Sequence, residues 1–232
     1  MRNNPQYSLE GIDAIRHLVR TSPWCSFVTA TARGIVASHY PVILDESAEG
    51  IVILSHMGRP DEEKHELGRH EMLAIVQGPH GYISPSWYGV DRAVPTWNFV
   101  TAHAYGVPEI LDDNENLAIL DRMVATFEGV LPRPFRLDVS PANAAYARAI
   151  VGGTVGFRLR VARIEAKEKM SQDKPPEVVD RIIDELDGVG PYAEVVDRII
   201  DELDGVGPYA NPALAAYMRA MRRGDFLRPG PS

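Results

Sequence analysis

The chain has 232 residues, 45% of them hydrophobic, and a formal net charge of −8. This length and composition exclude a disordered chain and allow one large domain, or a domain with an accessory lobe, around a real core. No basic start precedes an apolar run of signal-peptide length, and no stretch approaches the roughly 20 apolar residues of a membrane span, so we expect a soluble, cytoplasmic protein.

The first part of the chain predicts a helix followed by antiparallel strands. Residues 8–20 carry apolar side chains at helical spacing. The runs 24–31, 34–44 and 50–55 are rich in valine, isoleucine, threonine and aromatic residues and are separated by short polar or glycine-containing connections, which predicts an antiparallel meander. The single cysteine, Cys25, lies in the first run and is expected to be a buried small hydrophobic residue.

The middle of the chain adds further strands and then helices. The segments expected are a charged helix over 61–70, a strand over 72–77, a long strand over 96–110 with a bulge at Gly106, helices over 114–130 and 142–150, and a closing strand over 154–165. The helices flank the strands instead of alternating with them. The predicted fold class is therefore mainly β with flanking helices, an α+β protein built on a small closed antiparallel barrel.

The C-terminal part contains a tandem duplication. Residues 177–193 read EVVDRIIDELDGVGPYA, and residues 194–210 repeat this segment without a change. Each copy has apolar residues at helical spacing and ends in Gly-Val-Gly-Pro, which stops a helix. Two copies fall short of the three or more units of a solenoid. We expect one copy to pack as a helix and the other to add a helix with weaker contacts.

The negative charge is concentrated in this same late region. Residues 173–210 hold 11 acidic and three basic side chains, whereas residues 1–172 hold 20 and 17. The basic residues near the C-terminus are Arg219, Arg222, Arg223 and Arg228. So small a cluster does not match the basic face of a DNA-binding protein, and the charge pattern gives DNA contact no support.

The segment 77–106 has the densest cluster of unusual residues. It contains YISPSWY at 82–88 and VPTWNFVTAHAYG at 94–106, in which serine, threonine and asparagine are interleaved with aromatic rings. The rings can simply fill a barrel core. The same mixture also suits a planar, partly polar small-molecule ligand, which needs flat apolar faces and a few hydrogen-bonding groups along its rim.

These two motifs, followed by KMSQDK at 169–174, resemble the signature set of the PaiB-type family of FMN-binding negative transcriptional regulators. The order and spacing fit over about residues 1–172. The resemblance implies an FMN-binding split β-barrel, related in architecture to pyridoxamine-phosphate oxidases, and a homodimer with the flavin at the subunit interface. It also implies an FMN-binding domain over 1–172 with a helical insertion at about 113–150, followed by a helical extension over 173–232.

The resemblance assigns the flavin phosphate to two segments, Ala-Ser-His-Tyr-Pro at 37–41 and Ser-His-Met-Gly-Arg at 55–59. A phosphate dianion needs a guanidinium or ammonium group together with hydroxyl or backbone donors, so Arg59 is the first choice and Lys64 a second cation. The complete phosphate-side set is Ser38, His39, Ser55, His56, Arg59 and Lys64. The family continues Ala-Arg-Ala-Asn-Pro where this chain reads Gly-Arg-Pro-Asp-Glu-Glu-Lys-His, and three acids beside a phosphate are unfavourable unless they face solvent.

The resemblance assigns the isoalloxazine ring to the later motifs. The ring-side set is Trp87, Thr96, Trp97 and Asn98, from the same or the partner subunit, with Lys169, Ser171 and Gln172 reaching the site from the last strand. The family's Ser-Gln-Asn is Ser-Gln-Asp here. Asp173 can accept a hydrogen bond but cannot donate one when ionised.

The sequence lacks the motifs of metal sites and of several common enzyme classes. Seven histidines are present, but His65 and His70 are five residues apart, which places them on different faces of a helix, and no His-Glu-x-x-His pattern exists, so no metal site is predicted. The sequence lacks the nucleophile elbow G-x-S-x-G, the phosphate-binding loop G-x-x-x-x-G-K-[ST] and the dinucleotide motif G-x-G-x-x-G. Hydrolase, P-loop and Rossmann functions therefore lose their main support.

Three functions stay open at this point. The first is a flavin-binding transcriptional regulator, or a redox or metabolite sensor, although the sequence shows no helix-turn-helix with a basic recognition helix. The second is an FMN-dependent oxidoreductase, in which the cofactor performs the redox chemistry, although no catalytic residue can be named. The third is a split-barrel protein without flavin that serves as an interaction partner.

Overall fold

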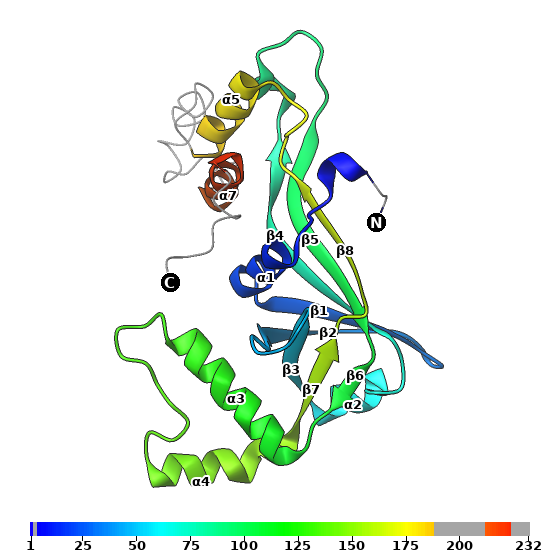
Figure 1. The fold of residues 1–232 in the computed structure, drawn as a ribbon, viewed down its shortest axis with the longest axis vertical. Helices are drawn as coiled ribbons and strands as arrows, with labels where there is room; N and C mark the ends of the chain where they lie inside the picture. Colours follow the sequence, from blue (N-terminus) through cyan, green and yellow to red (C-terminus); the bar gives the residue numbers. More distant parts are fainter. Residues whose placement is uncertain (2–3, 188–211, 224–232) are drawn as a thin grey trace, which may run out of the picture. The chain divides into compact units, whose positions relative to one another are not determined.

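The computed structural model describes residue 1, residues 4–187 and residues 212–223 (Figure 1). The strands are β1 (Trp24–Thr31), β2 (Gly34–Leu44), β3 (Val52–Gly58), β4 (Met72–Ile83), β5 (Thr96–Gly106), β6 (Pro108–Ile110), β7 (Thr154–Arg160) and β8 (Arg163–Lys169). The helices are α1 (Ile12–Thr21), α2 (Arg59–His65), α3 (Asp113–Glu128), α4 (Pro141–Ile150), α5 (Pro176–Leu186) and α7 (Pro212–Arg223), with short 3₁₀ turns at Pro5–Tyr7, Pro85–Tyr88 and Val151–Gly153.

The strands form one eight-stranded sheet in the order β6-β7-β3-β2-β1-β4-β5-β8. The strand pairs β1–β2, β1–β4, β2–β3, β3–β7 and β6–β7 are all antiparallel. This confirms the predicted class, mainly β and antiparallel with flanking helices. Among the described residues, none of the helices is long and apolar enough to cross a membrane.

Several predicted segments have other bounds in the structure: β4 continues to Ile83 instead of ending at 77, and the strand expected over 96–110 is divided into β5 and β6. Two further differences have a clear cause in the backbone. The closing strand expected over 154–165 is two strands, because the amides of Val161 and Ala162 donate to Ile51 and Tyr105 and turn the chain between β7 and β8. The helix expected over 61–70 ends at His65, because Glu66 takes a left-handed conformation with φ of 47° and caps the helix. Both differences arise from backbone geometry that apolar periodicity does not report.

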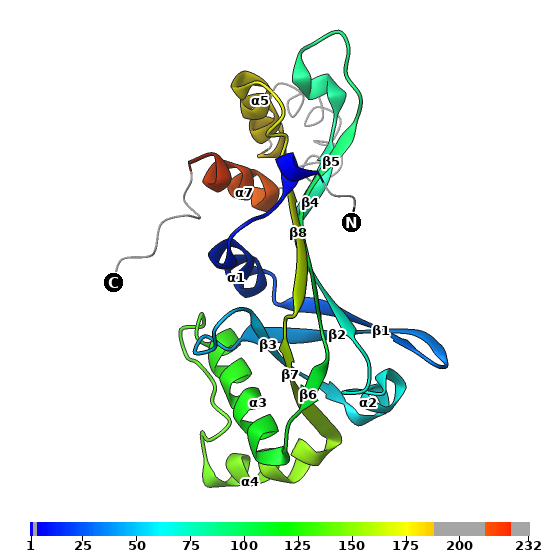
Figure 2. The ribbon, with the colours of Figure 1, turned by 45° about the vertical axis from the view of Figure 1, so that its right-hand side comes forward.

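The described residues divide into two compact units, which we treat separately. The second unit, Ile15–Gln77 with Ala102–Glu165, contains β1, β2, β3, β7 and the α3–α4 hairpin (Figure 2). Phe27 and Phe157 meet edge to face in its core, with ring centroids 5.2 Å apart. The helix α3 begins with a capping box formed by Asp112 and Glu115, and Ile119 and Met123 pack against β2 and β3.

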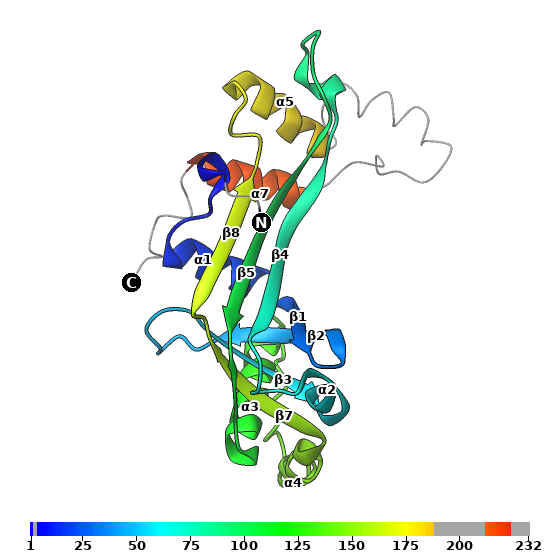
Figure 3. The ribbon, with the colours of Figure 1, turned by 90° about the vertical axis from the view of Figure 1, so that its right-hand side faces the viewer.

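The first unit comprises Met1–Ala14, Gly78–Thr101 and the described part of Ala166–Ser232 (Figure 3). Here α5 contains residues 177–186 of the first copy of the duplicated segment, and it buries Val178, Val179, Ile182, Ile183 and Leu186. The second copy, 194–210, lies outside the described residues. The expected difference in contacts between the copies, and the predicted domain boundary at residue 172, therefore stay predictions.

Candidate functional site

Arg59, the predicted phosphate ligand, is the first residue of α2 and directly follows β3. Its Nε donates to the carbonyl oxygen of Gly152 at 2.9 Å, and its two terminal nitrogens lie 3.0 Å from Glu62 and 3.8 Å from Asp113. The side chain of Arg59 is 45% exposed to solvent. The guanidinium is therefore accessible to an anion, but two carboxylates already neutralise it.

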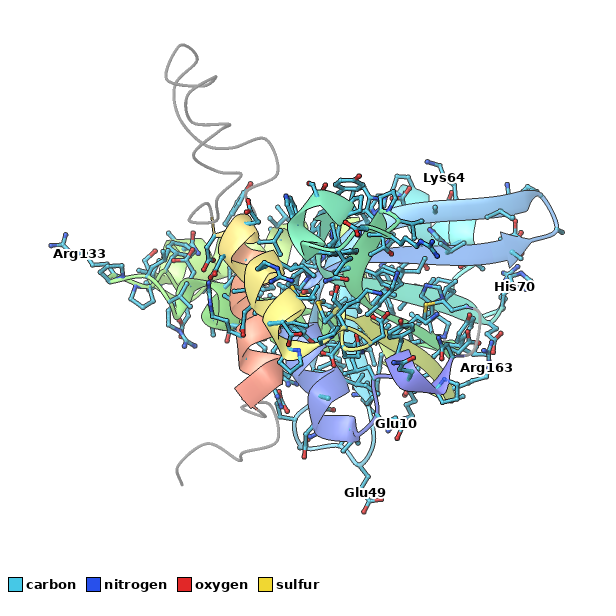
Figure 4. All side chains as sticks on the ribbon, turned by 90° about the horizontal axis from the view of Figure 1, so that it is seen from above. Glu10, Glu49, Lys64, His70, Arg133 and Arg163 are labelled. Atoms are coloured by element: carbon cyan, nitrogen blue, oxygen red, sulfur yellow. The ribbon has the colours of Figure 1, made fainter. Side chains whose placement is uncertain are left out.

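The remaining acids of α2 are only partly directed to solvent. Asp61 accepts a hydrogen bond from the Tyr40 hydroxyl at 2.8 Å and lies 3.3 Å from the ammonium of Lys64. The Tyr40 hydrogen bond holds the pKa of Asp61 below its usual value. Lys64 points outward from the molecule, as Figure 4 shows, and is 65% exposed. Of Asp61, Glu62 and Glu63, Glu63 alone is exposed. It is therefore the one acid of the three that faces solvent, as the sequence analysis requires of acids beside a phosphate.

The serine residues and His39 of the phosphate-side set form hydrogen bonds with neighbouring residues of the protein. Ser55 is fully buried and donates to the carbonyl oxygen of Pro41 at 2.8 Å. His39 is exposed and shares a hydrogen bond with Ser26 across β1 and β2. His56 is among the residues that line an open pocket beside α3 and α4, and burial lowers its pKa. Their roles as flavin ligands stay predictions.

His65 is a buried bridge between strands. Its Nδ1 lies 2.9 Å from the Thr29 hydroxyl and its Nε2 lies 3.0 Å from the Ser38 hydroxyl, and the side chain has 0% exposure. Both ring nitrogens are thus occupied within the core. Burial lowers the pKa of His65, so the imidazole is neutral near pH 7.

Replacing His65 with leucine should destabilise the second unit by about 2 kcal/mol at pH 7.5, because the buried Thr29 hydroxyl loses its hydrogen-bond partner. In the wild type, the unfolded chain takes up a proton on this histidine as the pH falls through about 6.5, while the folded state resists it. The contribution of His65 to the free energy of unfolding is therefore fully present above that pH and decreases below it. His17 and His56, whose pKa values are also lowered, add in the same direction.

Urea unfolding at pH 7.5 and pH 5.0 measures both effects. His65→Leu should show the lower stability at pH 7.5 and a smaller loss between the two pH values than the wild type. His39→Leu, the same change at an exposed histidine, is the control and should cost less than about 0.5 kcal/mol. An unchanged pH dependence in His65→Leu would contradict the assignment.

The ring-side residues lie in the first unit and fall into two groups. Trp97 is 55% exposed, with its ring edge-on to Tyr82. The Lys169 ammonium donates to the Thr96 hydroxyl, and burial lowers the pKa of Lys169. These residues present an exposed flat ring beside polar groups. Trp87, in contrast, is buried.

Asn98, Ser171 and Gln172 are occupied by internal hydrogen bonds. The Ser171 hydroxyl donates to the Asn98 side chain at 3.1 Å, and the Asn98 amide donates to the sulfur of Met218 in α7 at 3.5 Å. Asn98 has 0% exposure. Gln172 accepts from the amide of Met170 and donates to the carbonyl of Glu168. A ligand reaches Asn98 only if Met218 moves aside.

The chemical types of the hydrogen-bond donors fit a flavin phosphate, but nearby carboxylates compete with the phosphate for one of them. Arg59 supplies an accessible guanidinium and Lys64 an accessible ammonium, which are the groups that bind phosphate esters. Glu62 and Asp113 compete for Arg59. Sequence reasoning noticed acids beside Arg59 but missed Asp113, which comes from α3, and missed Met218, which comes from α7. Neither residue is near its partner in the sequence, so no local pattern could have found them.

Comparison with known proteins gives both a family and a fold. The family described as "Putative FMN-binding domain" matches residues 1–163. The protease synthase and sporulation protein PAI 2 of Bacillus subtilis (strain 168) is 29% identical over 186 residues, which cover 78% of this chain and 87% of that protein.

Two solved structures resemble the fold. The FAD and heme binding protein from Mycobacterium smegmatis has a TM-score of 0.52 at 13% identity, covering 75% of this chain and 79% of that chain. The flavocytochrome Anf3 from Azotobacter vinelandii has a TM-score of 0.53 at 12% identity, covering 78% of each chain. At such low sequence identity the comparison concerns the fold alone. The similarity of the two folds agrees with the predicted split barrel.

Proposed function

Because this chain belongs to the family of FMN-binding domains, we propose that it is a flavoprotein that binds FMN and holds the phosphate with Arg59 at the junction of β3 and α2. The observation that carries the proposal is the accessible guanidinium of Arg59, which the fold places at the end of a central strand. Lys64 adds a second positive charge, since it is 65% exposed and pairs with Asp61 alone among the described ion pairs.

The ring side of the proposal rests on the exposed indole of Trp97 and on the polar pair Thr96–Lys169. A flat apolar face with hydrogen-bonding groups beside it suits the rim of an isoalloxazine. Bound FMN supplies redox chemistry at this ring system. The chain's own contribution is binding, orientation and electrostatics.

The role proposed for the flavoprotein is that of a PaiB-like transcriptional regulator, or a redox or metabolite sensor, acting as a homodimer. The name of the Bacillus subtilis relative connects that protein with protease synthesis and sporulation, which supports a regulatory role. The charge pattern favours regulation through a bound ligand over direct contact with DNA, because a clustered basic face is missing from the sequence.

An FMN-dependent oxidoreductase is the second candidate, and Lys169 favours it. A lysine whose pKa is lowered by burial can hold or release a proton closer to neutral pH than a free lysine. NAD(P)H-driven bleaching of the flavin, followed by reoxidation in air, would support the enzyme. A salt-sensitive shift of promoter DNA by the purified protein would support direct regulation.

The direct test of flavin binding is the absorbance spectrum of the purified protein and the mass of the ligand released on denaturation. We expect flavin bands and the mass of FMN. The ligand-free protein should then take up FMN more tightly than riboflavin, which lacks the phosphate. A colourless protein that binds neither flavin would leave the interaction protein as the remaining function.

Replacing Glu62 with glutamine should strengthen FMN binding about fivefold, because it removes the carboxylate 3.0 Å from the Arg59 guanidinium. Riboflavin binding should not change, since it presents no phosphate to this group. Glu63→Gln is the matched control, with the same loss of charge at the next, exposed residue of α2. Fluorescence titrations with both flavins measure the ratio, and an equal gain for both would contradict the phosphate assignment.

A further inference from the structure

The helix α7 makes contacts within the first unit through three consecutive side chains. Each of them meets a different part of the unit: the pairs are Met218 with Asn98 of β5, Tyr217 with Glu168 of β8, and Arg219 with Asp187 after α5. Figure 1 shows α7 beside α5, and the two helices are in contact. Successive residues of a helix point about 100° apart, so a single turn of α7 makes contacts on several sides.

The apolar part of this attachment is small. Among the residues of α7 whose side chains the structure describes, Met218 alone is buried, whereas α5 buries a row of valine, isoleucine and leucine side chains. Burial of apolar surface is the main force that holds an amphipathic helix to a protein. The ion pair of Arg219 with Asp187 is partly exposed, and such pairs contribute little. We therefore expect α7 to separate from the unit far more readily than α5.

The side chain under Met218 is poorly satisfied by this contact. Asn98 is fully buried, and its carboxamide has two N–H donors and one acceptor oxygen. The oxygen accepts from the Ser171 hydroxyl at 3.1 Å, and the nitrogen donates to the Met218 sulfur at 3.5 Å. A thioether sulfur is a weak acceptor. A carbonyl oxygen in the place of this sulfur would therefore make a stronger hydrogen bond with the buried amide.

The backbone at Ser171 fixes the orientation of Asn98. Ser171 has a φ of 60°, in the left-handed region that is strained for a residue other than glycine. In this conformation its hydroxyl donates to the carboxamide oxygen of Asn98. Strain of this kind persists where the surrounding structure determines the conformation, and it is common at binding sites. The oxygen of Asn98 is thus held by Ser171, and its amide nitrogen is left to α7.

We propose that α7 is an autoinhibitory helix, in which Met218 occupies the place on Asn98 that the imide edge of a flavin ring takes, so that flavin binding displaces α7. The inference rests on the proposed flavin binding and adds its regulation. The imide edge carries carbonyl oxygens, which are the strong acceptors that the buried amide lacks. Docking of α7 and binding of the flavin exclude one another, so each weakens the other by the same factor. The released helix is then the output of a flavin sensor, and this output needs no contact with DNA.

The first test measures amide hydrogen exchange in the full-length wild-type protein, with and without flavin. Saturating FMN should accelerate exchange in α7 about tenfold, because the bound ring keeps the helix from docking. Saturating riboflavin should do the same, since it carries the same ring. Exchange in α3, which belongs to the second unit, is the internal control and should not accelerate. Exchange in α7 that slows or stays the same while flavin is bound would overturn the proposal.

The second test weakens the docking of α7 by substitution. Met218→Ala removes the side chain over Asn98 and should tighten binding of both FMN and riboflavin about tenfold. Arg219→Ala leaves Asn98 untouched, removes the ion pair with Asp187, and should tighten both about threefold. Arg33→Ala, the loss of an exposed arginine that pairs with Glu66 in the second unit, is the matched control and should change neither affinity.

The equal gain for the two flavins distinguishes this effect from any change at the phosphate. If Met218→Ala does not fold, Arg219→Ala decides alone, because its substitution lies outside the buried contact. Unchanged affinities in the folded variants would overturn the autoinhibitory role of α7 and leave flavin binding in place. A protein that binds neither flavin, as wild type and as both variants, would remove the proposed function and this inference together.

Discussion

Replacing Arg59 with alanine is expected to weaken FMN binding about 100-fold and to leave riboflavin binding nearly unchanged. Hydrogen bonds to a charged group contribute about 1.5–3 kcal/mol, and the upper part of this range corresponds to about two powers of ten in affinity. The phosphate is the single difference between the two flavins. The ratio of their affinities therefore isolates the contact with Arg59 from every contact with the ring.

The controls for this experiment come from the same unit. Arg33 is 70% exposed, pairs with Glu66, and belongs to neither flavin set, so Arg33→Ala should keep the wild-type ratio. Arg59→Ala also loses its pairs with Glu62 and Asp113, but exposed ion pairs contribute about 1 kcal/mol or less, and the unfolding midpoint should show a small change. A wild-type ratio of FMN to riboflavin affinity in a folded Arg59→Ala would remove Arg59 from the phosphate site.

Replacing Gly106 with alanine is expected to destabilise the protein by about 3 kcal/mol. A Cβ atom at this position would lie 2.4 Å from the carbonyl oxygen of Arg160 and 3.1 Å from Leu159. Backbone cannot yield as a flexible side chain does, so β5 and β7 would have to separate. The neighbouring hydrogen bond from Ala162 to Tyr105, 2.8 Å long, would be strained by the same movement.

Gly152 provides the matched control, because a Cβ atom there meets nothing within 4 Å. Gly152→Ala should change stability by less than about 1 kcal/mol. Urea unfolding of both variants measures the difference. Equal stabilities would show that β5 and β7 tolerate the added methyl group and that their close approach is not a requirement of the fold.

The first strands show how far local sequence reaches. The strands β1 and β2 have the bounds predicted for them, 24–31 and 34–44, because valine, isoleucine and aromatic residues fill both and Gly34 adopts the φ of 118° that the turn requires. The segment 154–165 also alternates like a single strand. It breaks because partners at Ile51 and Tyr105, far away in the sequence, take its central amides.

The candidate site also has some features that the local sequence determines and others that depend on contacts between distant residues. The sequence alone determined the residue types available to a flavin, above all the arginine after β3 and the aromatic residues of 82–106, since a motif is a property of neighbouring residues. Tertiary structure alone decided which of them are free, because Asp113 and Gly152 reach Arg59 and Met218 covers Asn98. Such contacts join residues tens of positions apart, and local preference carries no information about them.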